Sequence, residues 1–360
     1  MRPVFDLHCD ALQRSLDLGH DLGIETHGHF DFPRAVRGGV RAVSLTAWVD
    51  GSYAGEPGAA KRRANALLDA ADDLFARHPN TIRRIDDATA IDALPSGVVG
   101  CVLAIEGGHA LEDDPAQLEH YAARGVRVIT LTWNNHLRWA RSCRADAPAG
   151  TPDGLSALGR DIVREMNRLG IAADLSHAAE RTFYDALEIS DLPPLVTHSG
   201  CKAMSDHPRN VTDDQLRALA ERGGVLGIPF ATAFLDEDER ATERAYRRND
   251  ATFESIEAAS ATERLLREGD TIQRGLGPFP IGHVVRHAIH ALEIMGPDHV
   301  AIGSDFDGID RRPKGLEDAS GYPSLLEALA AKGVDEVTLG KIAYGNAQRV
   351  LSRTTAFAHH

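Results

Sequence analysis

The sequence has few cysteines and lacks the patterns that mark several large classes of protein. Its four cysteines, Cys9, Cys101, Cys143 and Cys201, show no CxxC spacing, and a disulfide framework is not expected in a chain of 360 residues. No apolar run approaches the ~20 residues that a membrane-spanning helix needs. The first strand signal begins within a few residues of Met1, which leaves no room for a cleavable signal peptide. We therefore expect a reduced, cytoplasmic protein that does not enter a membrane.

Positive charge is also scarce. The chain has 39 Lys and Arg residues against 53 Asp and Glu residues, and its formal net charge is −14. Nucleic-acid binding needs a basic face, so a nucleic-acid partner is not expected, although a local basic pocket for a carboxylate is compatible with this balance. No GxGxxG or P-loop motif follows a strand signal, which disfavours nucleotide binding. We expect a small-molecule substrate and allow for a homodimer.

Apolar runs of strand type alternate with amphipathic stretches of helical period along the chain. The strand signals lie at 3–7, 40–48, 99–105, 126–132, 171–175, 194–197, 224–229 and 299–304. Helical periodicity is clear at 59–78, 154–170 and 212–224, where Thr212 and Gln215 form a capping-box pattern. Alternating β and α signals imply a parallel sheet, and eight such units favour a closed barrel over an open sheet. The predicted fold class is α/β, a (β/α)₈ TIM barrel.

The length of the chain fits one decorated barrel, since such a barrel takes about 250 residues and more with insertions. We predict a single domain over 1–352, followed by a C-terminal tail at 353–360. Residues 231–280 follow the seventh strand signal, are rich in Glu, Arg and Asp, and are too long for one turn. We expect an inserted helical segment there that could cover the site as a lid.

Side chains that bind metals recur where the strand signals end. The set consists of His8, Asp10, Glu106, His177, His198 and Asp305. Because parallel strands of a closed barrel end at one rim, side chains at these positions are expected to converge. Imidazole and carboxylate groups are ligands for zinc and similar metals. The pattern predicts a metal centre at the mouth of the barrel and favours a hydrolytic metalloenzyme.

Each of these positions has a simpler interpretation when it is taken alone. His8 and Asp10 share a strand face, but the pair could be a solvated strand end. Glu106 could pair with an arginine, and a lone histidine is usually structural. An acid near two metals is suited to proton transfer, and Asp305 and Asp307 have the same parity. Strand alternation therefore leaves both as candidates for that acid.

Several spaced motifs resemble those of the membrane (renal) dipeptidase family, peptidase family M19, within the amidohydrolase-like TIM barrels. The segments that carry the resemblance are DLHCDAL, AIEGGHAL, DLSH, THSG, HPRNVTDDQL, VAIGSDFDG and GNAQRVL. They cover most of the chain and follow the family's order. A series of motifs in order is far more specific than any one of them.

The resemblance implies a metal-dependent dipeptidase with two zinc ions. By motif position, His8 and Asp10 would hold one ion, and His177 and His198 would hold the other. Glu106 would bridge the two ions together with a water or hydroxide. The bridging hydroxide would attack the scissile carbonyl of a short peptide, and L-Xaa-D-Xaa dipeptides are among the substrates that relatives accept.

The same resemblance assigns roles around the metals. Asp305 would be the catalytic residue that relays a proton to the leaving amine. Arg209 would bind the C-terminal carboxylate of the substrate, which a guanidinium can hold with two parallel hydrogen bonds. Trp133 stands where the family often has a histidine, so substrate preference is open at this point. We assign Trp133 and Asn134 to substrate binding, although a tryptophan is more often pocket wall or core.

Two alternatives belong to other classes. The first is a different amidohydrolase reaction, on a cyclic amide, an N-acyl amino acid or a phosphoester. Such relatives often have H-x-H on the first strand and a carbamylated lysine, whereas this chain has His8-x-Asp10 and no lysine in its fourth-strand motif. The second is a metal-binding homologue without turnover. Asp305 and Arg209 argue against it, because a metal binder needs neither.

Overall fold

A closed barrel of parallel strands forms the centre of the computed structural model, which describes residues 2–250 and 252–357. The barrel strands are β1 (Val4–Cys9), β2 (Val40–Trp48), β4 (Val99–Glu106), β5 (Val126–Thr130), β6 (Ala172–Asp174), β7 (Leu195–Val196), β8 (Val225–Ile228) and β9 (Val300–Ile302). The ring closes where β2 pairs with β4. The predicted (β/α)₈ barrel is thereby confirmed, and each predicted strand range overlaps one barrel strand.

One strand was not predicted. β3 (Ile82–Arg84) pairs in parallel with the first residues of β4, below the point where β5 joins that strand. It carries two exposed arginines and only one buried residue, Ile82, so it has no apolar run for a sequence pattern to detect. It lies outside the ring and contributes nothing to the barrel mouth.

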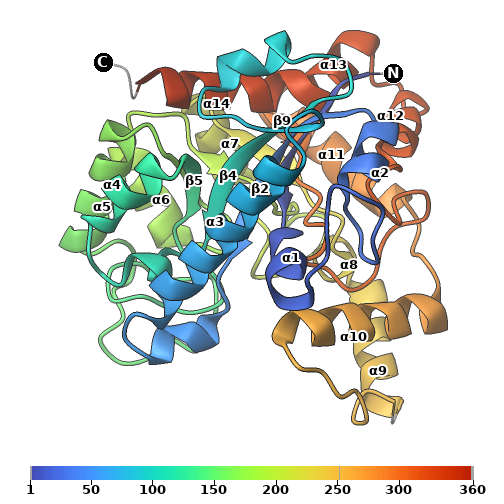
Figure 1. The fold of residues 1–360 in the computed structure, drawn as a ribbon, viewed down its shortest axis with the longest axis horizontal. Coiled ribbons are helices and arrows are strands. Elements are labelled where there is room, and N and C mark those ends of the chain that lie inside the picture. The colour runs from blue at the N-terminus through green and yellow to red at the C-terminus, as the bar shows by residue number, and fades with distance from the viewer. Residues whose placement is uncertain (1, 251, 358–360) are drawn as a thin grey trace.

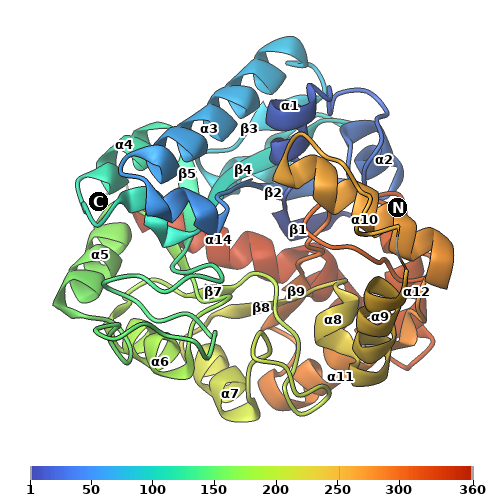
Figure 2. The same ribbon diagram turned by 90° about the horizontal axis from the view of Figure 1, so that it is seen from below.

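Helices surround the ring, as Figure 2 shows in a view from the end that carries α9 and α10. They are α1 (Leu12–Leu18), α2 (Phe32–Arg37), α3 (Ala59–Arg77), α4 (Gln117–Ala123), α5 (Ala157–Arg168), α6 (Glu180–Ile189), α7 (Asp213–Glu221), α8 (Thr232–Leu235), α9 (Glu237–Asn249), α10 (Ala261–Leu276), α11 (Gly282–Met295), α12 (Tyr322–Ala330), α13 (Glu336–Gly340) and α14 (Asn346–Phe357). None of the helices in the described ranges is both long and apolar enough to span a bilayer.

Local sequence signals explain where several helices begin and end. The Thr212 side chain accepts from the Gln215 backbone at the start of α7, and Gln215 returns the bond, so the predicted capping box is present. Gly170 and Gly223, which follow α5 and α7, have φ values of 64° and 73°. Glycine takes this left-handed conformation without a Cβ penalty, which suits it to end a helix before a strand.

Apolar side chains fill the barrel interior, and a helix covers its far end. Phe5, Leu7, Ala42 and Val128 belong to one buried cluster together with the α14 residue Val350. In Figure 1, α14 crosses the molecule at the end opposite to α9 and α10. The N-terminal ends of the strands are therefore covered by α14, and the C-terminal ends form the open mouth.

The segment after the seventh barrel strand is helical, as predicted. It contains α8, α9 and α10, and α10 lines a cavity above the mouth. The predicted tail at 353–360 falls partly on α14, which continues to Phe357, and its last residues, 358–360, lie outside the described residues. Thr354 and Thr355 on α14 are buried, so these two positions pack against the body of the protein.

Candidate metal centre

The predicted ligands converge at the mouth of the barrel although they come from different strand ends. His8 Nε2 lies 3.5 Å from Asp10 Oδ1. His177 Nε2 and His198 Nε2 are 3.2 Å apart. All five of the predicted ligand side chains are buried. Among the described residues, three groups of donors could each hold one metal ion, and two of them consist of predicted ligands alone: His8, Asp10 and Glu106, and Glu106, His177 and His198. The third group joins His8 and His198 to Asp174.

Glu106 belongs to both groups because its two oxygens face in different directions. Its Oε2 lies 3.6 Å from His8 Nε2. Its Oε1 lies 2.9 Å from His177 Nε2 and 3.3 Å from His198 Nε2. Glu106 is the last residue of β4, so its side chain projects from the rim between the strands that carry the two groups. A carboxylate in this position presents one oxygen to each of the two donor groups.

A β-bulge turns His8 toward the barrel interior. Asp6 pairs with Val43 and Cys9 pairs with Leu45, so two residues of β1, Leu7 and His8, stand opposite one residue of β2. Both therefore point inward, whereas strict alternation would place His8 on the outer face with Asp6. The Asp6 carboxylate does lie outside, where it accepts hydrogen bonds from Ser304 and from Tyr322 on α12.

A single hydroxyl beneath the metal groups orients two of the histidines. Thr197 Oγ1 donates to Asp174 Oδ2 at 2.7 Å and lies 2.8 Å from His198 Nδ1 and 3.2 Å from His8 Nδ1. A hydroxyl has one proton and two lone pairs. Because the Thr197 hydroxyl uses its proton in the hydrogen bond to Asp174, its lone pairs accept hydrogen bonds from both imidazoles. Each Nδ1 is then protonated, and each Nε2 is free to bind a metal. The buried Asp174 also accepts from Thr130 Oγ1.

Unsatisfied buried atoms and the donor chemistry both fit a metal. His8 Nε2 and Asp10 Oδ1 are buried without a hydrogen-bond partner among the described residues. Burial would raise the pKa of Glu106, but the charge of His8 and the hydrogen bonds from the histidines hold it well below its ordinary value. Burial and the charge of Arg209 lower the pKa of His177 to about 4. Against the effect of burial, Asp10 and Glu106 raise the pKa of His8 well above its ordinary value, so a metal ion would take the place of the proton on this imidazole. Carboxylates and imidazoles are ligands that zinc binds.

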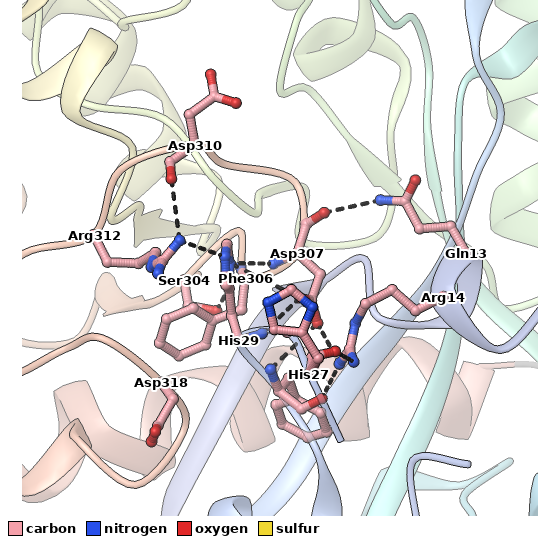
Figure 3. A network of polar contacts seen from close by, with 12 residues as sticks. Gln13, Arg14, His27, His29, Ser304, Phe306, Asp307, Asp310, Arg312 and Asp318 are labelled. Atoms are coloured by element: carbon pink, nitrogen blue, oxygen red, sulfur yellow. Dashed lines mark hydrogen bonds and ion pairs between the residues drawn. The ribbon is translucent and has the colours of Figure 1, made fainter. Parts of the chain in front are cut away.

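Asp305 and Asp307 occupy different environments despite their equal parity. Asp305 has a φ of 62° and lines the cavity over the ligands, and within the described part of the chain no side-chain hydrogen bond holds its carboxyl group. Burial raises its pKa well above the ordinary value, and Asp10 and Glu106 add to this shift while His8 opposes it. Asp307 instead points into a separate buried network, which Figure 3 shows from close by. The geometry therefore favours Asp305 as the acid beside the candidate metal ligands.

The network around Asp307 uses both of its carboxylate oxygens. Oδ1 accepts from the His29 backbone at 2.7 Å, and Oδ2 accepts from the Phe30 backbone at 3.2 Å. Oδ2 is also 2.8 Å from the guanidinium of Arg14, and both of these side chains are fully buried. The Asp307 carboxylate is thus engaged in holding the loop after β9 against the segment around residues 27–30 (Figure 3).

A cavity of about 340 Å³ opens over the metal groups. Its walls include Trp48, Trp133, Asn134 and Phe234, together with Ala261, Arg264, Leu265 and Glu268 of α10. The rings of Trp133 and Trp48 meet edge to face with centroids 5.4 Å apart, so Trp133 forms a wall. Asn134 is exposed, and its Oδ1 lies 3.1 Å from His177 Nδ1, so it orients a ligand from the side opposite to the metals.

Arg209 lines a second cavity, of about 440 Å³, that shares His177 with the first. Its guanidinium donates to Ser199 Oγ and to the carbonyl oxygen of His198, and stacks over the Phe234 ring at 5.0 Å. The side chain is buried, and among the described residues Nε has no hydrogen-bond partner and no carboxylate forms an ion pair with it. A buried guanidinium in this state is suited to bind an anion.

Comparison with known proteins places this site in a family. The model of the membrane dipeptidases, peptidase family M19, matches residues 1–360. The chain belongs to the membrane dipeptidase family. Its sequence is 36% identical over 257 residues to an uncharacterised protein from the pqqA 5′ region of Klebsiella pneumoniae, covering 71% of this chain and 82% of that protein. Membership in this family makes the protein a hydrolase.

Further similar proteins are described as dipeptidases or metallopeptidases. An uncharacterised dipeptidase of Schizosaccharomyces pombe is 36% identical over 266 residues, which are 72% of this chain but only 54% of the yeast protein. A metallopeptidase of Rhodobacter sphaeroides, solved with a phosphinate mimic of the dipeptide L-Ala-D-Ala, is 28% identical with a TM-score of 0.80, covering 98% of this chain and 99% of that one. A dipeptidase of family M19 matches equally well in identity and TM-score, over 98% of each chain.

Some residues of this membrane dipeptidase site were not predicted from the sequence. Asp174 and Thr197 hold the histidines from below, and Arg14 neutralises Asp307. One signal was present for Asp174, since a charged residue within an apolar strand must find partners when it is buried. Arg14 gave no such signal, because an arginine on the short amphipathic helix α1 is usually solvated.

Proposed function

We propose that this protein is a dipeptidase that uses two zinc ions held by His8, Asp10, Glu106, His177 and His198. The observation that carries the proposal is the position of Glu106, whose two carboxylate oxygens face two different donor groups. Bound zinc would supply an activated water at neutral pH and polarise the scissile carbonyl.

Opposite charges in the two cavities support a substrate with a free amine and a free carboxylate. The first cavity is lined by Asp10, Asp50, Glu106, Glu268 and Asp305 against one cation, Arg264. The second cavity has Arg209 in its wall. A dipeptide zwitterion fits with its ammonium group in the first cavity and its carboxylate on Arg209. A longer peptide would leave this guanidinium without its charged partner, so short substrates are favoured.

Asp305 is placed to carry the proton that peptide cleavage requires. Its carboxyl group faces the same cavity as the ligands. It would take a proton from the attacking water and deliver it to the departing amine. Among the described residues no cationic side chain forms an ion pair with Asp305. Its carboxyl group, which lines the cavity, is therefore free to change protonation state during a turnover.

The decisive experiment pairs metal analysis with a substrate panel. Protein purified without chelator should contain about two zinc ions per chain, as the binuclear proposal requires. It should hydrolyse dipeptides, tested with both L and D residues at the second position to ask whether L-Xaa-D-Xaa is preferred. N-acyl amino acids, which lack the free amine, serve as the control and should be poor substrates. Full activity in protein stripped of metal would overturn the proposal.

A further inference from the structure

The second cavity concentrates positive charge in a protein that is acidic as a whole. The chain carries a net charge of −14. The charged residues that line this cavity are the cations Arg141, Arg144, Lys202 and Arg209 and the anions Glu180 and Asp206. Cations therefore outnumber anions here, in contrast to the first cavity, where acids dominate. This local reversal of charge marks the cavity as a site for an anion.

The cations at the rim of this cavity are only loosely held by other side chains. Arg144 lies 3.7 Å from Asp146, and Lys202 lies 3.7 Å from Asp206. The side chains of both pairs are between 44% and 78% exposed. Long, exposed ion pairs of this kind contribute little free energy. Arg144 and Lys202 can therefore turn toward a ligand at small cost.

The positive charges of the arginines act on two groups, Cys143 in the cavity lining and His207 outside it. His207, on the loop before Arg209, has its pKa lowered to about 3 by burial and by the charges of Arg240, Arg209, Arg244 and Arg144. Burial raises the pKa of the Cys143 thiol, and Arg209 and Arg144 both act against that shift. Arg144 and Arg209 thus act on the same two groups from different loops.

We propose that this cavity is a subsite for the side chain of the substrate's C-terminal residue, and that the preferred side chain is acidic. The proposal rests on the proposed function, in which Arg209 binds the α-carboxylate. The side chain branches from the carbon that bears this carboxylate, so it enters the same cavity. There it meets Arg144 and Lys202. The substrate class is a dipeptide with aspartate or glutamate at its second position.

Matched substrates test this inference in the zinc-loaded enzyme. L-Ala-Glu and L-Ala-Gln, each with the D and the L form of the second residue, differ in one charge at nearly equal size. We expect kcat/KM for the better glutamate isomer to exceed that of the corresponding glutamine dipeptide about tenfold, and the ratio to fall as salt screens the charges. Equal rates for the two peptides would overturn the subsite while leaving dipeptidase activity intact.

Variants then connect the preference to the cavity. In the double variant Arg144→Met, Lys202→Met the ratio of glutamate to glutamine should approach one. Arg83→Met is a control, because Arg83 is an exposed arginine on β3, far from the barrel mouth, and its loss lowers the net charge by one unit where the double variant lowers it by two. The control should keep the wild-type ratio. A double variant that also kept the wild-type ratio would contradict the proposal.

A binding measurement separates failure of the subsite from failure of the proposed function. Free glutamate and free glutamine are compared for their effect on the Tm of the zinc-loaded protein. Glutamate should raise Tm more than glutamine does, and the difference should vanish in the double variant. If no dipeptide is hydrolysed but this difference appears, the proposed function is wrong and the anion site stands. If glutamate and glutamine act alike, the subsite is wrong whatever the activity.

Discussion

The carboxylate of Asp307 and the guanidinium of Arg14 form an ion pair of 2.8 Å between two side chains that are both fully buried. Asp305, two residues earlier, faces the ligand cavity instead. One acid therefore stabilises the fold of the loop after β9, and the other is available for chemistry. The sequence motif contains both acids, and the residues around each acid determine whether it stabilises the loop or is available for chemistry.

Asp307→Asn should destabilise the protein strongly. The amide would place an NH₂ group against a donor, since both oxygens of Asp307 accept from backbone N–H groups and one also accepts from Arg14. Removing one partner of a buried ion pair typically costs about 3–5 kcal/mol in the free energy of unfolding. Denaturant unfolding of the variant and the wild type measures this change. A loss below about 1 kcal/mol would show that the pair is not structural.

Asp305→Asn should have the opposite profile and serves as the matched substitution. It exchanges the same atoms two positions away, where burial raises the pKa of the carboxyl group well above its ordinary value. We expect the free energy of unfolding and the bound metal to change little. Turnover should fall by roughly 10²–10⁴-fold, the contribution typical of a positioned acid or base. Near wild-type kcat in the metal-loaded variant would remove Asp305 from the mechanism.

Thr197→Val should weaken metal binding without removing a ligand. Valine keeps the shape of threonine but cannot donate to Asp174 or accept from His8 and His198. Loss of such a supporting contact typically lowers metal affinity by about 10–100-fold. Thr197→Ser retains the hydroxyl and is the control. Competition with a chelator gives both affinities, and equal values for Val and Ser would mean that the hydroxyl does not orient the histidines.

Glu243 on α9 should make stability depend on pH near neutrality. Burial, aided by the charge of Asp310, raises its pKa from 4.5 to about 7, with Arg311 acting in the opposite direction. The folded state then binds more protons than the unfolded state between these values. Stability is therefore fully present below about pH 4.5 and is lost as pH rises toward and through 7.

The variant Glu243→Gln removes this titration. We expect it to be more stable than the wild type at pH 8 by of the order of 2 kcal/mol, and to show a flatter profile from pH 5 to 8. Thermal unfolding across this range, with zinc held constant, gives the comparison. Parallel profiles for the two proteins would show that Glu243 titrates normally in the folded state.

The strand pattern carried enough information to predict the barrel and the rim where the ligands meet. Most barrel strands are largely apolar runs, and the ligands lie at or just beyond the ends of such runs, as Glu106 ends β4. Whether a ligand stands at the end of an apolar run depends only on its neighbours in the sequence, so the sequence alone reveals it. β3 was missed because two of its three residues are exposed arginines and leave no apolar period.

The direction in which His8 points depended on more than local pattern. Strict alternation from Phe5 and Leu7 would put His8 outside the barrel, and the bulge in β1 reverses that parity. The bulge is set by pairing with β2, which begins far along the chain. Likewise, Arg14 meets Asp307 only after the barrel has closed, so no spacing rule connects these residues. Contacts of this kind belong to the tertiary structure.

Because α14 covers the far end of the barrel, the mouth is the path by which substrate enters the site and products leave it. Substrate and both amino-acid products then pass through the same opening, which α10 borders. A product that dissociates slowly from Arg209 would occupy the binding site of the next substrate. Product inhibition is therefore expected to be competitive, and the amino acid that carries the free carboxylate of the former C-terminus should be the stronger inhibitor.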